Sequence, residues 1–256
     1  MSLHRVATGE GPDVALLHGW ALNGSVFESL AARLAPTHHV HALDLPGHGR
    51  SPWAKGNGDL EGLARHVAGH IPERCNLVGW SLGGMVALRI ATLFPERVPR
   101  LVLLATTPCA TQRRGWSHGL DEPTLCGIEK KLARDWRTAV LEVVGLSVRG
   151  DDRQLDTLRE LRRCAGEHGD PSPAALAAGL AVLRGADLRS ELARVRARTL
   201  VIGGAADRVT SPAAAHALAA GIVGARLEMI AGAAHAPFLS HRDQVEPLVL
   251  DFLSAP

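Results

Sequence analysis

The sequence has 256 residues, of which 46% are apolar, and a formal net charge of +2. This length allows one large domain or two small ones, and the apolar content excludes a disordered chain. The small net charge gives no indication of a nucleic-acid-binding protein.

Targeting and redox signals are equally sparse. No apolar run approaches the roughly 18 residues that span a bilayer, and residues 1–17 lack the charged and apolar segments of a signal peptide. The four cysteines form no C-x-x-C pair, so reduced thiols are the simplest interpretation. We expect a cytoplasmic protein.

Strands and helices alternate over the first part of the chain. We predict strands at 13–17, 39–44, 76–78 and 100–106. The intervening helices are predicted between Ser25 and Pro36, at 59–71 and at 85–93. Continuous apolar strands that alternate with helices are typical of a mostly parallel sheet with helices on both faces.

The pattern changes in the middle of the chain and then resumes. Residues 108–190 contain no convincing strand, only helical stretches at 123–134, 137–146, 153–164 and 173–183. After them we predict strands at 199–202 and 226–230 and helices at 212–222 and 242–253. We therefore expect an α/β core formed by residues 1–107 and 191–256, with residues 108–190 inserted as a helical lid.

The segment Gly79-Trp80-Ser81-Leu82-Gly83-Gly84 lies between a predicted strand and a predicted helix. Strand, G-x-S-x-G and helix together indicate a nucleophile elbow, in which a serine projects from a strained turn. The glycines two residues before and after the serine leave room for that turn. Ser81 is therefore the predicted nucleophile.

A serine nucleophile needs an imidazole base and a carboxylate that orients the imidazole. In a fold with a nucleophile elbow, the carboxylate follows the serine along the chain, and the histidine follows the carboxylate. Of thirteen histidines, His235 is the one that directly follows the last predicted strand, since His241 opens the final helix, where we expect a surface residue. Asp207 is the carboxylate in the loop after the strand at 199–202. The rival Asp44 is explained by hydrogen bonds to amides of its own Gly-rich loop.

An oxyanion hole needs two backbone amides, and the N–H of Leu82 at the helix N-terminus is one candidate. The other is the N–H of Trp20 in His18-Gly19-Trp20, a loop that follows an early strand. His18 is expected to brace this loop. We predict no cofactor and no metal site, because alternation along a strand separates His38, His39 and His41 and no carboxylate or cysteine completes a ligand set.

These motifs, with Asp44-Leu45-Pro46-Gly47-His48-Gly49-Arg50-Ser51, resemble the α/β-hydrolase superfamily over the whole chain. More narrowly, the chain resembles the family of pimeloyl-[acyl-carrier protein] methyl ester esterases of biotin synthesis. The narrowing segments are Leu17 to Asn23, Gly79 to Gly84, Pro108-Cys109, Asp187-Leu188-Arg189 and Ala233 to Phe238.

The resemblance implies a cytoplasmic serine esterase that hydrolyses the methyl ester of pimeloyl-acyl-carrier protein, with a lid inserted after the sixth strand. It implies a monomer with one partner, the acyl carrier protein. The substrate contacts that it implies are Trp20, Ser81, Leu82, Val143, Val144, Gly145, Leu146, Ser147 and His235. Val143 and Ser147 replace an aromatic residue and an amide of the family pattern.

Alternatives on the same fold are a general short-chain carboxylesterase and a carbon–carbon bond hydrolase. The presence of Ser81, Asp207 and His235 together argues against a non-catalytic receptor, and a serine at position 81 excludes dehalogenase chemistry. An acidic carrier protein would need basic groups near the pocket mouth. Candidates are Arg149, Arg153, Arg159, Arg162 and Arg163, although acidic residues between them also fit a solvated helix surface.

Overall fold

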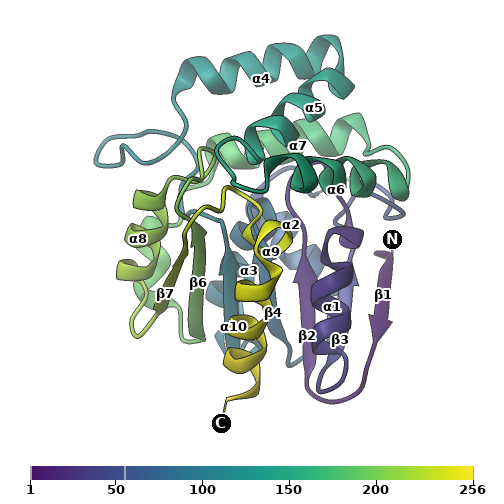
Figure 1. Cartoon of the computed structure of the whole chain (residues 1–256), viewed down its shortest axis with the longest axis vertical. Helices are drawn as coiled ribbons and strands as arrows, with labels where there is room; N and C mark the ends of the chain where they lie inside the picture. Colours follow the sequence, from purple (N-terminus) through teal and green to yellow (C-terminus); the bar gives the residue numbers. More distant parts are fainter. Residues whose placement is uncertain (1, 55, 256) are drawn as a thin grey trace.

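The computed structural model describes residues 2–54 and 56–255, which form a seven-stranded sheet in the order β1-β3-β2-β4-β5-β6-β7 (Figure 1). The strands are β1 (Arg5–Thr8), β2 (Asp13–Leu17), β3 (His39–Leu43), β4 (Asn76–Trp80), β5 (Arg100–Leu104), β6 (Arg198–Gly204) and β7 (Arg226–Ile230). All neighbouring strands are parallel except β1 and β3. The predicted, mostly parallel sheet is confirmed.

Strand β1 was not predicted from the sequence. All four of its residues are exposed, and it pairs with β3 alone, at the edge of the sheet. An edge strand of this kind needs no run of buried residues, so the apolar pattern that identified the other strands is missing here.

Helices cover both faces of the sheet. Helices α1 (Glu28–Leu34) and α10 (Arg242–Ser254) pack together on one face, and α2 (Leu60–Ala68) and α3 (Leu82–Leu93) pack together on the other (Figure 1). Helix α8 (Pro212–Gly221) packs on β6 and β7. The central strands β4 and β5 are consequently almost entirely buried.

The segment between β5 and β6 is helical, as predicted. It contains α4 (Glu122–Arg134), α5 (Trp136–Ser147), α6 (Gln154–Glu167), α7 (Pro173–Gly185) and the short 3₁₀ helix η3 (Arg189–Arg194). Helices α4 to α7 lie together beyond one end of the sheet (Figure 1). This insertion follows β5, the fifth strand of the described residues, and not a sixth strand as expected, because only one antiparallel strand precedes β2 there.

Among the described residues, no helix is both long enough and apolar enough to cross a lipid bilayer. The four cysteines, Cys75, Cys109, Cys126 and Cys164, are free thiols, as the sequence predicted.

Candidate active site

Ser81 lies in a strained turn between β4 and α3, with φ +54° and ψ −118°. Only glycine adopts this region freely, so the surrounding backbone must hold the serine there. The two flanking glycines make the turn possible. A Cβ on Gly79 would lie 2.4 Å from the Gly83 carbonyl oxygen, and a Cβ on Gly83 would lie 2.1 Å from the Leu17 carbonyl oxygen.

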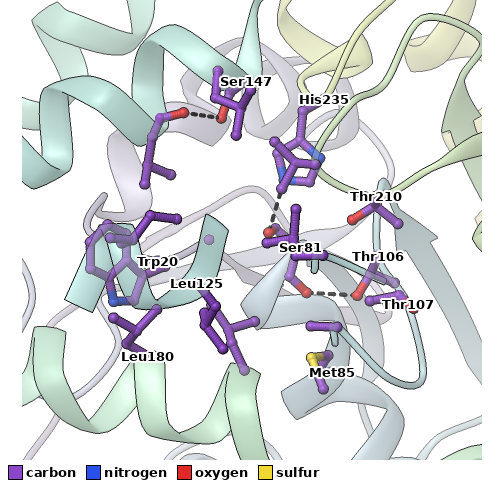
Figure 2. A pocket seen from close by; sticks show the side chains of 18 of the residues that line it. Trp20, Ser81, Met85, Thr106, Thr107, Leu125, Ser147, Leu180, Thr210 and His235 are labelled. Carbon is purple, nitrogen blue, oxygen red and sulfur yellow. Dashed lines mark hydrogen bonds between the residues drawn. The ribbon is translucent and has the colours of Figure 1, made fainter. Parts of the chain in front are cut away.

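The structure brings Ser81, His235 and Asp207 into one hydrogen-bonded chain. His235 Nε2 lies 2.9 Å from Ser81 Oγ (Figure 2), and His235 Nδ1 lies 2.8 Å from Asp207 Oδ2. Because a carboxylate only accepts, Nδ1 carries the proton and Nε2 is free to accept the serine proton. The histidine and the aspartate are buried, 2% and 4% exposed, and the serine is partly exposed.

The second carboxylate oxygen of Asp207 fixes the orientation of the first. Asp207 Oδ1 accepts hydrogen bonds from the N–H groups of Val209, at 2.8 Å, and Thr210, at 2.9 Å. Oδ2 is thereby directed at His235. A hydroxyl, an imidazole and a carboxylate in this arrangement can carry out nucleophilic acyl transfer.

The two predicted oxyanion-hole amides, the N–H groups of Trp20 and Leu82, have no hydrogen-bond acceptor among the described residues. Leu82 is the first residue of α3, where the helix dipole also favours a negative charge. The indole N–H of Trp20 donates to the carbonyl oxygen of Leu176 in α7, at 2.9 Å. Both backbone N–H groups are therefore free to donate hydrogen bonds to a developing oxyanion.

Two buried histidines brace the loop that carries Trp20. His18 Nδ1–H donates to the Gly19 carbonyl at 2.7 Å, and its Nε2 accepts from the Leu45 N–H at 2.8 Å. The Nε2 of His48 accepts from the Ala21 N–H. Burial lowers the pKa of His18, and it lowers the pKa of His48 to about 3. Both rings are therefore neutral at pH 7, and the bracing role expected for His18 is confirmed.

A pocket opens above Ser81. In Figure 2, Trp20, Leu125 and Leu180 lie on one side of it, and Thr106, Thr107 and Thr210 lie on the other. Met85, Ile128 and Leu183 also line it. The insertion thus supplies much of the apolar wall, from α4 and α7.

The expected lid contacts divide by helical position. Val143, Leu146 and Ser147 line the pocket, because residues three and four apart share one face of α5. Val144 and Gly145 do not line it, and Val144 is buried in the core. The Leu82 side chain is also absent from the lining, so this residue offers its amide alone. The Ser147 hydroxyl already donates to the Val143 carbonyl, at 2.8 Å.

Sequence reasoning missed the threonines after β5 and in the acid loop. Thr106 Oγ1 donates to the Ser81 carbonyl at 2.7 Å, and Thr210 supplies an amide to Asp207. Their position in the sequence could have identified them, because both follow the carboxyl ends of parallel strands, where the binding sites of α/β sheets form. Neither threonine carries a carboxylate, the group by which the third member of the triad was identified.

Two other expectations need correction. His241 opens α10 but is buried, 2% exposed, and its Nδ1 pairs with Ser240 Oγ at 2.8 Å. Asp44 does accept from an amide of its own loop, that of Arg50, but its other oxygen accepts from the N–H of Gly24, the first residue of the 3₁₀ helix η1 (Gly24–Phe27).

The expectation that alternation separates the strand histidines, and that no carboxylate joins them, is wrong for His39 and His41. His39 and His41 lie two residues apart and so share a face of β3, and Asp13 of the neighbouring strand lies beside them. Asp13 Oδ1 is 3.0 Å from His39 Nδ1 and 2.7 Å from His41 Nε2. Both rings thus hydrogen-bond to Asp13, and the buried Nδ1 of His41 has no hydrogen-bond partner among the described residues.

The chain resembles known proteins over nearly its full length. A family model described as alpha/beta hydrolase family matches residues 14–248. A protein of Nitrosomonas europaea named pimeloyl-[acyl-carrier protein] methyl ester esterase is 39% identical over 243 residues, which cover 95% of this chain and 96% of the relative. A protein of Aeromonas salmonicida with the same name is 36% identical, with coverage of 99% and 100%.

Solved structures agree on the fold. An esterase from Exiguobacterium antarcticum superposes with a TM-score of 0.88 at 22% identity, covering 99% of this chain and 96% of that chain. An enol-lactonase from Burkholderia xenovorans LB400 superposes with a TM-score of 0.84 at 24% identity, with coverage of 98% and 96%.

Proposed function

The chain belongs to the alpha/beta hydrolase family, and we propose that it is the esterase that releases methanol from the methyl ester of pimeloyl-[acyl-carrier protein]. The observation that carries this proposal is the hydrogen-bonded order Ser81, His235, Asp207 beneath an apolar pocket. The names of the relatives with 36 to 39% identity supply the substrate.

The geometry supports a two-step reaction. Ser81 Oγ attacks the ester carbonyl carbon while His235 Nε2 takes the serine proton, and the N–H groups of Trp20 and Leu82 bind the resulting oxyanion. Collapse of this intermediate breaks the bond to the methoxy oxygen. That oxygen takes the proton from His235 and leaves as methanol.

Water then hydrolyses the acyl-enzyme in the second step. His235 takes a proton from water, whose oxygen attacks the acyl-enzyme carbonyl and forms a second oxyanion in the same hole. The bond to Ser81 Oγ breaks, the serine regains its proton from His235, and a free carboxylic acid leaves and ionises. Asp207 keeps the imidazole in the required tautomer throughout.

Residues 108–190 serve, in this proposal, as the substrate-binding lid on a core of residues 1–107 and 191–256. Supporting this division, Leu125 and Ile128 of α4 and Leu180 and Leu183 of α7 line the pocket. Such a lining suits the methylene chain of a pimeloyl group, because burial of each CH₂ contributes about 0.8 kcal/mol.

An acidic carrier protein would be attracted by unpaired basic groups on the insertion. Arg163 of α6 is a poor candidate, because it pairs with Glu28, Glu160 and Glu167. Arg162 is exposed and has no ion-pair partner among the described residues, and Arg159 pairs only with the exposed Asp156. We assign the carrier-facing charge to Arg159 and Arg162.

Growth of a bacterial strain that lacks its own biotin esterase, without added biotin, tests the function. Expression of this chain in the cytoplasm should restore growth, and expression of Ser81→Ala should not. A purified protein that hydrolyses simple esters but fails to restore growth at comparable expression would instead indicate a general short-chain carboxylesterase.

A further inference from the structure

The peptide backbone of His235 is held from two sides. Its N–H donates to the carbonyl oxygen of Ser147, the last residue of α5, at 3.0 Å. Its carbonyl oxygen accepts from the indole N–H of Trp80, the last residue of β4, at 2.7 Å. The insertion therefore contacts the backbone of the histidine as well as lining the pocket.

A buried carboxylate extends this contact. Asp151, in the turn between α5 and α6, is 6% exposed. Its Oδ2 accepts from the N–H of Ala234 at 2.9 Å, and its Oδ1 accepts from the N–H of Arg153 at 2.8 Å. Next to it, the N–H of Asp152 donates to the Gly232 carbonyl at 3.0 Å.

The loop before His235 is held mainly through its backbone, and the N–H of Ala206 adds a hydrogen bond to the Ala233 carbonyl at 2.9 Å. It reads Gly232-Ala233-Ala234, so it offers no large side chain to pack into the core. Gly232 has φ +75°, a conformation in which glycine gives the backbone its freedom. Hydrogen bonds to the backbone must therefore fix the loop, and the N–H of Ala234 lies in a residue only 1% exposed, where an unmade bond is costly.

We propose that Asp151 is a positioning residue for the reaction: its carboxylate holds the Ala234 N–H and so fixes the place of His235 between Ser81 and Asp207. The inference deepens the proposed function and rests on it, because it takes His235 as the catalytic base. Nothing in the G-x-S-x-G, acid and histidine motifs identifies Asp151, which lies 84 residues before His235. The turn between α5 and α6 thereby becomes part of the catalytic framework.

The decisive variant is Asp151→Asn. Asparagine has one side-chain oxygen, which can keep the local bond to the Arg153 N–H at the start of α6. Its NH₂ group then faces the Ala234 N–H, so two donors meet where a bond existed. The bond to the Arg153 N–H is preserved and the contact to the His235 loop is lost.

Asp121→Asn is the matched control. Asp121 caps α4 in the same insertion, and its carboxylate accepts from the Thr124 N–H alone. Among the described residues it makes no hydrogen bond or ion pair with the His235 loop. Both variants remove one negative charge and can keep a local bond to a backbone N–H, and only Asp151→Asn loses a bond to the loop of His235.

We expect Asp151→Asn to lower kcat by about ten- to a hundredfold, as a misplaced catalytic group does, with KM nearly unchanged. Asp121→Asn should match the parent enzyme. The low-field proton resonance of His235 Nδ1–H, which reports its bond to Asp207, should weaken or shift in Asp151→Asn only. Circular dichroism checks that each variant is folded, and Asp151→Ser gives a second, smaller substitution if Asp151→Asn is not.

Two outcomes would overturn the inference: a folded Asp151→Asn with the parent's kcat and an unchanged His235 resonance, or an equal loss in Asp121→Asn. Failure of the proposed function is distinguishable, because the parent enzyme itself would then leave the carrier-bound methyl ester unchanged, whether or not it hydrolyses a small ester. The His235 resonance still tests the positioning role in that case.

Discussion

The orientation of Asp207 predicts the effect of replacing it with asparagine. The N–H groups of Val209 and Thr210 both point at Oδ1, so the single side-chain oxygen of the asparagine must take that position. The NH₂ group of the amide then faces His235 Nδ1, which must become an acceptor. The imidazole proton moves to Nε2, the atom that should accept the proton of Ser81.

This inverted tautomer removes the general base without removing a hydrogen bond. A carboxylate-to-amide change in a serine protease triad lowers kcat by about 10⁴-fold, equivalent to about 5 kcal/mol of activation free energy. We expect a loss of that size for Asp207→Asn. The melting temperature should change little, because all three hydrogen bonds made by the side chain at this position can be kept.

Steady-state hydrolysis of a chromogenic short-chain ester measures the loss, and Asp44→Asn serves as the control. Asp44 is also a buried carboxylate, but it accepts from the N–H groups of Gly24 and Arg50 and lies 3.9 Å from His168 Nδ1. Its amide variant should lose about 1–3 kcal/mol of stability and keep most of its turnover. A kcat for Asp207→Asn within tenfold of the parent, or a larger loss in Asp44→Asn, would refute the assignment.

The packing of Trp20, the burial of His48 and the exposed arginines of α6 each lead to a further prediction. Gly179→Ala places a Cβ 2.7 Å from Trp20 Cδ1, so it should displace the loop that carries Trp20 and lower kcat/KM for the chromogenic ester. In the control Gly166→Ala, the new Cβ meets no atom within 4 Å, so kcat/KM should match the parent and the helix should gain up to about 1 kcal/mol of stability. Burial lowers the pKa of His48 to about 3, so between about pH 6.5 and pH 3 this histidine is protonated in the unfolded chain but not in the folded one. Urea melts should therefore show the free energy of unfolding falling as the pH drops through this range, less steeply in His48→Gln. Changing Arg159 and Arg162 to glutamate should raise KM for the carrier-bound ester but not for a free methyl ester. The same change at the exposed Arg33 and Arg74, outside the insertion, should alter neither KM value. Equal effects of the two pairs would place the docking surface elsewhere.

The sequence identified those parts of the site that depend on chain order. Ser81, Asp207 and His235 each follow a strand, and a parallel sheet brings the carboxyl ends of its strands together, so spacing and local glycines were sufficient. The same local reasoning found α4 to α7 within a few residues of their bounds.

Contacts between distant segments were beyond that reasoning. Asp151 reaches the His235 loop, and the Trp20 indole reaches α7, through packing that no local pattern encodes. Burial of His241 and the pairing of Arg163 with three carboxylates have the same origin. Exposed β1 lacked the apolar pattern altogether.

The central claim is that Ser81 attacks the methyl ester of pimeloyl-[acyl-carrier protein], and the intact mass of the carrier protein tests it most directly. After incubation with the parent enzyme, the carrier should have lost the mass of one methylene group, as its methyl ester becomes a carboxylate. With Ser81→Ala, the mass should stay that of the ester. An unchanged carrier ester in the presence of parent enzyme that hydrolyses a small ester, or conversion by Ser81→Ala at the parent's rate, would contradict the claim.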